Sequence, residues 1–97
     1  DLDGALQDIQ QAMSINAQSP MYQAEEASIY IRQEKYEEAL QSIDKALALA
    51  PDFAACYRLR GVCYIRTGKK DAACEALNKA KELGDPVAEK LIKENCQ

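Results

Sequence analysis

Cysteine is the residue type in this chain best suited to chemistry, and the sequence contains four, at positions 56, 63, 74 and 96. No two of them form a C-x-x-C pair, and the chain has no histidine, which argues against a zinc site and a thioredoxin-like redox motif. Cys56 and Cys63 would lie two turns apart on one helix face, roughly 10 Å along the axis and too far to bridge. We therefore expect four reduced, mostly buried thiols that pack as small hydrophobic side chains, which favours a reducing compartment.

The remaining polar residues form no recognisable catalytic set. Without histidine, a cysteine or serine nucleophile has no obvious base. The neighbouring pairs Glu25-Glu26 and Glu37-Glu38 are expected on exposed helix turns, where adjacent side chains diverge by about 100° around the axis. No glycine-rich phosphate loop is present, and the glycines read as packing or capping residues. The sequence therefore predicts a protein that is not an enzyme and that needs no cofactor and no metal.

The charge is distributed unevenly along the 97 residues, whose formal net charge is −4. Residues 1–57 contain three basic and ten acidic side chains, a balance of −7, and residues 58–97 contain nine basic and six acidic, a balance of +3. Two solvated faces of opposite sign, or a basic end that meets an acidic partner, would both explain this. No dense Lys/Arg stripe suggests nucleic acid, and no apolar run approaches the roughly 18 residues of a membrane span. We expect no nucleic-acid or membrane contact and a cytoplasmic location.

The chain repeats itself with an offset of 34 residues. A self-match at such a period is the signature of a repeat architecture. The residues that recur are small or apolar and stand at helical spacing, so a packing arrangement is repeated rather than a reactive group. The matches are Tyr30 with Tyr64, Ala39 with Ala5 and Ala73, Ile43 with Ile9 and Leu77, and Ala46 with Ala80.

Apolar periodicity and capping residues predict six helices, at about residues 2–15, 20–33, 36–49, 53–67, 71–83 and 87–96. We expect helix starts at Ser19-Pro20, Asp52 and Asp85-Pro86, and left-handed helix ends at Gly68 and Gly84. A tight turn at Glu34-Lys35 lacks the glycine usual there. Loops of two to four residues make consecutive helices antiparallel, and no strand is predicted. The predicted fold is all-α, a right-handed superhelical stack of antiparallel helix pairs with a concave and a convex face.

The repeated residues also resemble a known family. Tyr57-x-x-Arg60-Gly61-x-x-Tyr64, followed by Ala73-x-x-x-Leu77 and Ala80, closely resembles the tetratricopeptide repeat signature. Gln23-x-x-Glu26-Ala27-x-x-Tyr30, followed by Ala39, Ile43, Ala46 and Pro51, is a looser second copy. The resemblance implies a single domain over 1–97 with about two and a half repeats. Its parts are the second helix of an incomplete repeat (1–17), two full repeats (20–53 and 54–87) and a C-terminal capping helix (86–97).

Proteins that resemble this chain bind a protein or peptide in the concave groove, which the first helix of each pair lines. The resemblance therefore implies a non-catalytic protein–protein interaction module. Arginine forks bind carboxylates bidentately, so three groove arginines suit an acidic partner, although plain solubility would also explain them. The groove residues implied are Ser28, Ile31, Arg32, Arg58, Val62, Ile65 and Arg66.

Two further implications concern the partner. One subclass of the family clamps a C-terminal carboxylate with Lys and Asn at set groove positions, where this chain has Ala24, Ser28 and Leu59. The resemblance therefore disfavours a chaperone-tail clamp of that type. The alternative function is a structural or self-assembly element that stacks on further repeats or forms a homodimer through the incomplete N-terminal repeat.

Overall fold

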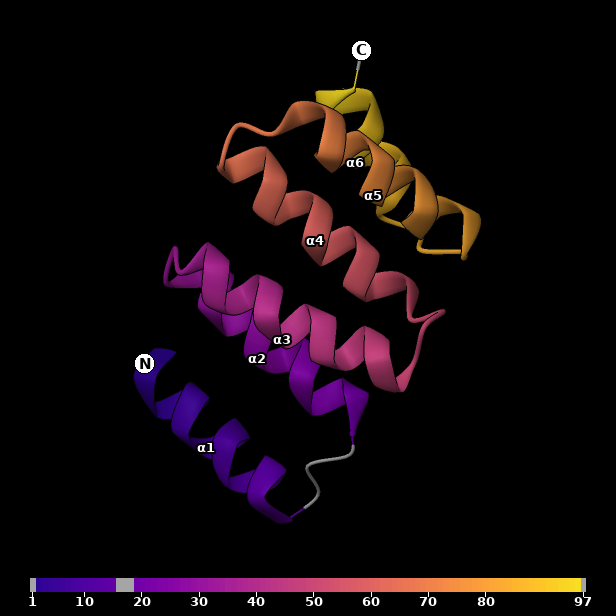
Figure 1. The fold of residues 1–97 in the computed structure, drawn as a ribbon. Coiled ribbons are helices and arrows are strands. Elements are labelled where there is room, and N and C mark those ends of the chain that lie inside the picture. Colours follow the sequence, from indigo (N-terminus) through magenta and orange to yellow (C-terminus); the bar gives the residue numbers. More distant parts are fainter. Residues whose placement is uncertain (1, 16–18, 97) are drawn as a thin grey trace. The chain divides into compact units, whose positions relative to one another are not determined.

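The computed structural model describes residues 2–15 and 19–96, and it confirms the all-α fold class (Figure 1). Over those two ranges the chain forms six helices and no strand. All predicted helix boundaries agree with the structure within one residue. The helices are α1 Leu2–Ile15, α2 Pro20–Arg32, α3 Tyr36–Leu49, α4 Ala54–Arg66, α5 Lys70–Glu82 and α6 Ala88–Asn95.

The chain divides into two compact units, Asp1–Pro51 and Asp52–Gln97. In the first unit α2 packs on both α1 and α3, and in the second α5 packs on both α4 and α6. Helices that follow one another within a unit run antiparallel (Figure 1). The division falls close to the predicted repeat boundary at 53/54. The assignment of all residues to one domain stays a prediction, and residues 16–18, between the first two predicted helices, lie outside the described residues.

Three helices end in the same left-handed turn. Glu34, Gly68 and Gly84 have φ values of 61°, 79° and 94°. At the first turn, the N–H of Glu34 donates to the Ile31 carbonyl at 3.0 Å and the next N–H donates to the Tyr30 carbonyl at 2.8 Å. The corresponding pair of bonds recurs at Gly68 and Gly84. This pattern satisfies carbonyls that the helix end would otherwise leave without partners. Because a side chain in this conformation costs roughly 1 kcal/mol, Glu34 occupies a place better suited to glycine.

Two predicted helix starts are only partly right. Pro20 stands in the first turn of α2, as predicted, but the hydroxyl of Ser19 makes no capping hydrogen bond. Asp52 was predicted as the cap of α4, and this is wrong because Phe53 occupies the N-cap position. The N–H of Cys56 donates to the Phe53 carbonyl at 3.0 Å, so the first turn closes one residue after Asp52.

Small residues let the helices of each unit approach closely. In the first unit, Ala27 on α2 and Ala39 and Ala46 on α3 are fully buried together with Ile43. In the second unit, Gly61 stands at the position that corresponds to Ala27, and Leu77 at the position that corresponds to Ile43. The backbone of α4 at Gly61 comes so close to α5 that a Cβ atom there would clash with Leu77. The 34-residue repeat therefore describes a repeated contact between two helices.

One buried polar pair joins the helices of the first unit. Glu26 on α2 is 7% exposed, and its carboxylate accepts a hydrogen bond of 2.7 Å from the hydroxyl of Ser42 on α3. The expectation that Glu25 and Glu26 both lie on an exposed turn is therefore wrong for Glu26 and right for Glu25, which is exposed. Burial without a donor would be costly for a carboxylate, and Ser42 supplies that donor.

Candidate binding surface

The predicted groove residues of the first unit lie on α2. Ser28 and Ile31 are half-buried, and Arg32 is exposed. Residues three and four apart on a helix are neighbours on its surface, so the three side chains share one side of α2. Ser28 and Arg32 open onto a hollow of about 420 Å³ between α1 and α2, which Ile31 does not line. The other residues of this hollow are Ala5, Asp8 and Ile9 of α1 and Glu25 and Ile29 of α2.

This first hollow is not strongly basic. Asp8 and Glu25 stand beside Arg32 in its lining, and all three side chains are exposed. Other carboxylates of the first unit act on Tyr30 of α2: burial raises the pKa of its hydroxyl, and the charges of Glu26 and Glu38 raise it further. An acidic ligand would meet competition from these carboxylates, so Arg32 alone gives this hollow little preference for anions.

The predicted groove residues of the second unit lie on α4. Val62 and Ile65 are half-buried, and Arg66 is exposed. Because Ile65 and Arg66 follow Val62 by three and four residues, the three side chains form a stripe on α4. In this stripe two aliphatic side chains stand next to the exposed guanidinium of Arg66. Arg60 lies with its guanidinium 5.4 Å from the centroid of the Tyr57 ring. The second unit therefore presents the more continuous apolar stripe with a basic end.

Arg58 differs from Arg66 because it already has a partner. Its Nε lies 3.0 Å from one carboxylate oxygen of Asp85 and 3.2 Å from the other. The Asp85 side chain is 6% exposed and that of Arg58 is 26% exposed. The prediction that Asp85 caps the last helix is wrong, because Val87 occupies that N-cap position. The carboxylate of Asp85 forms a salt bridge with the guanidinium of Arg58 instead. Arg58 remains a predicted groove residue, but a ligand would have to compete with a nearly buried carboxylate for it.

A second hollow, of about 190 Å³, lies in the second unit. Its lining combines an aliphatic side chain, a basic one and an amide, namely Ile65 of α4, Gly68, Lys70 and Ala73 of α5, and Asn95 of α6. Ile65 is the one predicted groove residue in this lining. From the sequence, Gly68 was expected to end a helix and residues 86–97 to form a capping helix. Gly68, Lys70 and Asn95 were therefore not predicted to line one hollow. No sequence signal links these three, because they come together only when α4, α5 and α6 are packed.

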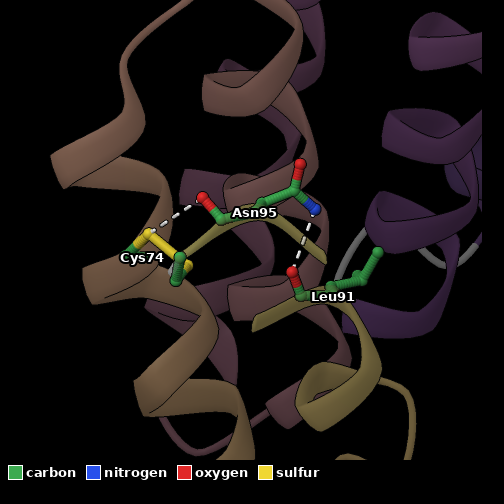
Figure 2. Close-up of a disulfide and its surroundings, with 4 residues drawn as sticks. Cys74, Leu91 and Asn95 are labelled. Atoms are coloured by element: carbon green, nitrogen blue, oxygen red, sulfur yellow. Dashed lines mark hydrogen bonds between the residues drawn. A yellow bond between two sulfur atoms is a disulfide. The ribbon is translucent and has the colours of Figure 1, made fainter. Parts of the chain in front are cut away.

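The cysteines differ from the sequence expectation. Cys74 of α5 and Cys96, directly after α6, form a disulfide with a Cα–Cα distance of 5.7 Å (Figure 2). The prediction of four free thiols is therefore wrong for this pair. The two cysteines can bond because the chain turns back after α5. Helix α6 packs on α5 and brings cysteines 22 residues apart in sequence within bonding distance. The Sγ of Cys74 also lies 4.0 Å from the carbonyl oxygen of Asn95. It could donate a hydrogen bond to that oxygen only as a thiol, because a disulfide sulfur carries no proton.

The other two cysteines behave as predicted. Cys56 and Cys63 are free and fully buried on α4. Burial raises the pKa of each thiol to about 11, although the guanidinium groups of Arg60 and Arg58 oppose the rise at Cys56. A buried thiol that stays protonated is a poor nucleophile. These two residues therefore contribute to packing.

Within residues 2–15 and 19–96 there is no group of three or more Cys, Asp or Glu side chains that could hold a metal ion. In the same residues no helix is both long and apolar enough to cross a membrane.

The chain belongs to the tetratricopeptide repeat (TPR) family. The family model for the tetratricopeptide repeat matches residues 27–91, about two thirds of the chain. This confirms the resemblance found in the repeated residues and fits the six helices formed by residues 2–15 and 19–96. No curated protein matches the sequence closely enough to be named as a relative.

Solved structures with the same fold are TPR domains. The first TPR domain of Spaghetti (RPAP3) bound to the HSP90 peptide SRMEEVD superposes with a TM-score of 0.89 at 22% identity, over 99% of this chain and 78% of that one. The Sgt2 TPR domain from Aspergillus fumigatus has a TM-score of 0.89 at 20% identity, over 98% and 66%. The second TPR domain of human RPAP3, in complex with the HSP70 peptide SGPTIEEVD, has a TM-score of 0.86 at 19% identity, over 99% and 82%. At these identities the likeness shows the fold alone.

Proposed function

We propose that this chain is a non-catalytic protein–protein interaction module that binds an acidic peptide segment along the first helices of its repeats. Membership of the TPR family supports the class of function. The observation that carries the proposal is the stripe on α4, where half-buried Val62 and Ile65 stand next to exposed Arg66. Such a stripe can bury aliphatic side chains of a ligand and place a carboxylate against a guanidinium.

The charge of the second unit favours an acidic ligand. Residues 52–97 contain nine basic and seven acidic side chains, a balance of +2, and residues 1–51 contain three basic and nine acidic, a balance of −6. Arg66 ends the stripe and α4, and two further basic residues follow it in the chain, Lys69 before α5 and Lys70 at its start. All three are exposed. Because Arg58 is engaged by Asp85, we assign the anion contact in this unit to Arg66 first. In the first unit, taken by itself, we assign the proposed surface to Ser28, Ile31 and Arg32.

The peptides bound by two similar structures end in the acidic sequence EEVD. This supports an acidic ligand. It does not support recognition of the ligand's terminal carboxylate by a Lys/Asn clamp. Where the resemblance places the Lys and Asn of the carboxylate clamp, this chain has Ala24, Ser28 and Leu59. We therefore propose that acidic side chains of the ligand, rather than its terminal carboxylate, are recognised.

Fluorescence anisotropy with a labelled SRMEEVD peptide tests the proposal. We expect its affinity to fall at least tenfold when its three acidic side chains are replaced by amides, because each charge-assisted hydrogen bond contributes roughly 1.5–3 kcal/mol. Amidation of the C-terminus should change the affinity less than threefold. Arg66→Glu should weaken binding strongly, whereas Lys81→Glu, the same charge change at an exposed site on α5, should not.

Equal binding of the acidic peptide and its amide counterpart would contradict the proposal, as would equal effects of the two charge reversals. Loss of binding on amidation alone would instead indicate an end-clamp that we do not expect. Each variant is first checked by thermal unfolding, since exposed substitutions usually change stability by less than about 0.5 kcal/mol.

Self-assembly is the second candidate, and one observation favours it. Leu2, Leu6 and Ile9 of α1 are only half-buried although α1 packs on α2. A homodimer through α1 would cover them further. Sedimentation between roughly 5 and 200 µM tests this: a monomer throughout would contradict a dimer, and a concentration-dependent dimer abolished by Leu6→Glu would support it.

The cytoplasmic location stays a proposal with weakened support. It was inferred from four reduced thiols, and the disulfide between Cys74 and Cys96 removes that basis for one pair. Disulfides persist chiefly in oxidising compartments, and those in reducing ones are usually transient or redox-sensing.

A further inference from the structure

Helix α6 is held to its unit by a small apolar contact. It has eight residues, Ala88–Asn95, of which Ala88 is buried and Leu91 and Ile92 are half-buried. Its charged side chains, Glu89, Lys90, Lys93 and Glu94, are all exposed. An eight-residue helix is not stable by itself in water, so the position of α6 depends on what attaches it to α5.

The disulfide is the covalent part of that attachment. Cys96 directly follows the last residue of α6, and Cys74 lies in the first half of α5. Figure 2 shows the sulfur–sulfur bond at this end of α6, next to Asn95. Cys74 and Cys96 are both half-buried, whereas Cys56 and Cys63 are fully buried, so the bonded pair lies nearer to the solvent. Thiol chemistry in the folded protein is thereby directed to one pair of sulfurs.

The same bond positions one wall of the second hollow. Asn95, the residue before Cys96, lines it together with Ile65, Gly68, Lys70 and Ala73. The Nδ2 of Asn95 donates to the Leu91 carbonyl at 2.9 Å, which ties the side chain to its own helix rather than to α5 (Figure 2). If the end of α6 leaves α5, Asn95 therefore leaves with it, and the hollow next to Ile65 loses a wall.

We propose that the Cys74–Cys96 disulfide is a reversible redox switch that holds the end of α6 on α5 and thereby completes the ligand-binding surface at Ile65. The release of α6 does not depend on the proposed function, whereas its effect on ligand binding rests on that function. In the oxidised protein Asn95 forms one wall of the hollow. In the reduced protein the C-terminal turn of α6 detaches and the surface binds its acidic ligand more weakly.

The reductant is a dithiol. Its thiolate attacks one sulfur of the pair, a mixed disulfide forms, and the other cysteine leaves as a thiolate that takes up a proton. The second thiol of the reductant then attacks the mixed disulfide and releases the remaining cysteine. Two electrons and two protons are transferred in total: Cys74 and Cys96 become thiols, and the dithiol becomes a disulfide. Reoxidation by a disulfide of the same class runs the exchange backwards.

Hydrogen exchange measured by mass spectrometry tests the release of α6 without any ligand. Oxidised protein, protein reduced with dithiothreitol, and the Cys74→Ala/Cys96→Ala variant with and without dithiothreitol are compared. We expect the amides of α6 to exchange at least tenfold faster in the reduced protein and in the variant, with those of α3 unchanged. Dithiothreitol should not alter the variant further, which excludes an effect through Cys56 or Cys63.

Unchanged exchange in α6 after complete reduction would overturn the proposal. If the alanine variant did not fold, the oxidised and reduced natural sequences would still decide the question, with α3 as the internal reference. Complete reduction is verified by alkylating the denatured protein and counting the labelled cysteines.

The labelled SRMEEVD peptide tests the second half. We expect its affinity to be at least threefold higher for the oxidised protein than for the reduced one, and to be insensitive to dithiothreitol in the variant. Release of α6 with equal affinities would overturn the link between the switch and the binding surface. Release of α6 with no binding in either state would contradict the proposed function and leave the redox release of α6 supported.

Discussion

Gly61 on α4 and Leu77 on α5 are in such close contact that a Cβ atom on Gly61 would stand 2.7 Å from both Cγ and Cδ2 of Leu77. Leu77 is fully buried, and the Ala73 carbonyl oxygen would lie 3.3 Å from the same atom. Since real Cβ atoms do not approach other atoms so closely, even the smallest side chain at Gly61 must displace Leu77 or its helix. The contact is therefore a sensitive point of the second unit.

We expect Gly61→Ala to lower the free energy of unfolding by about 1–3 kcal/mol through overpacking, despite the better helix propensity of alanine. Chemical denaturation measures this. The double variant Gly61→Ala/Leu77→Ala should lose less than the sum of the two single variants, because the shorter side chain makes room for the new methyl group. Strict additivity, or a stabilising Gly61→Ala, would contradict the close approach.

Ser42→Ala should destabilise the first unit by about 1–3 kcal/mol, because it leaves the buried carboxylate of Glu26 without its hydroxyl donor. The matched control is Ser28→Ala on α2, where the half-buried serine should cost much less. Thermal and denaturant unfolding of both variants compare the two costs. Equal effects would mean that the hydrogen bond of 2.7 Å contributes little.

Arg58→Gln should destabilise the second unit, since it leaves Asp85 nearly buried without its counter-charge. Breaking a fully buried pair costs roughly 3–5 kcal/mol, and because Arg58 is a quarter exposed we expect about 1–3 kcal/mol here. Arg58→Glu should cost more, because it places a second carboxylate against Asp85. Arg66→Gln is the control, and its unfolding midpoint should stay near that of the natural sequence.

Arg58 and Arg66 should therefore differ in how they tolerate a reversal of charge. Arg66 should tolerate it because it is exposed, and Arg58 should not because it is paired. A binding test that uses Arg58→Glu would therefore confuse lost folding with lost binding. Arg66 and Arg32 are the informative positions.

Alkylation should distinguish the two classes of cysteine. Native protein at pH 8 should incorporate almost no iodoacetamide, because Cys56 and Cys63 are buried with pKa values near 11 and the other two are bonded. Denaturation without reductant should expose two thiols, and denaturation with reductant should expose four. Mass spectrometry counts the adducts. Four adducts without reductant would show that Cys74 and Cys96 are not bonded.

The buried thiols also predict a dependence of stability on pH. Their pKa is raised from an ordinary value of 9.0 to about 11 on folding, so the folded state holds these protons more tightly. This contribution to stability is complete below about pH 9 and is lost as the pH rises towards 11. The slope is at most about 1.4 kcal/mol per pH unit for each thiol. Cys63→Ala should show a shallower decline over this window, measured by urea unfolding. An identical slope would contradict the assignment.

The helices were predictable from the sequence because their determinants are local or periodic. Apolar spacing and the 34-residue repeat place α3 at Tyr36–Leu49, and they pair Gly61 with Leu77 as they pair Ala27 with Ile43. The turn at Glu34 was recognised although its residue is a poor choice for a left-handed conformation. In each case the physical cause lies within one helix pair.

The features that were missed depend on contacts between residues far apart in the chain. Glu26 looks like a surface residue until α3 brings Ser42 to it. Asp85 looks like a helix cap until it is found beside Arg58, 27 residues earlier. The spacing of Cys74 and Cys96 gives no sign that α6 folds back onto α5. Of the predicted surface, Ser28 and Arg32 line the first hollow and Ile65 lines the second, and their roles in binding stay proposals.

The disulfide also has a mechanical consequence. If the protein is stretched between residues on either side of the bonded segment, the 21 residues between Cys74 and Cys96 carry no tension, because the load passes through the sulfur–sulfur bond. About 22 residues of contour, roughly 75 Å at full extension, stay hidden from the pulling device until the bond is reduced. Helix α6 and most of α5 would thus bear force only in a reducing solution, and the same molecule would act as a shorter or a longer tether according to the thiols around it.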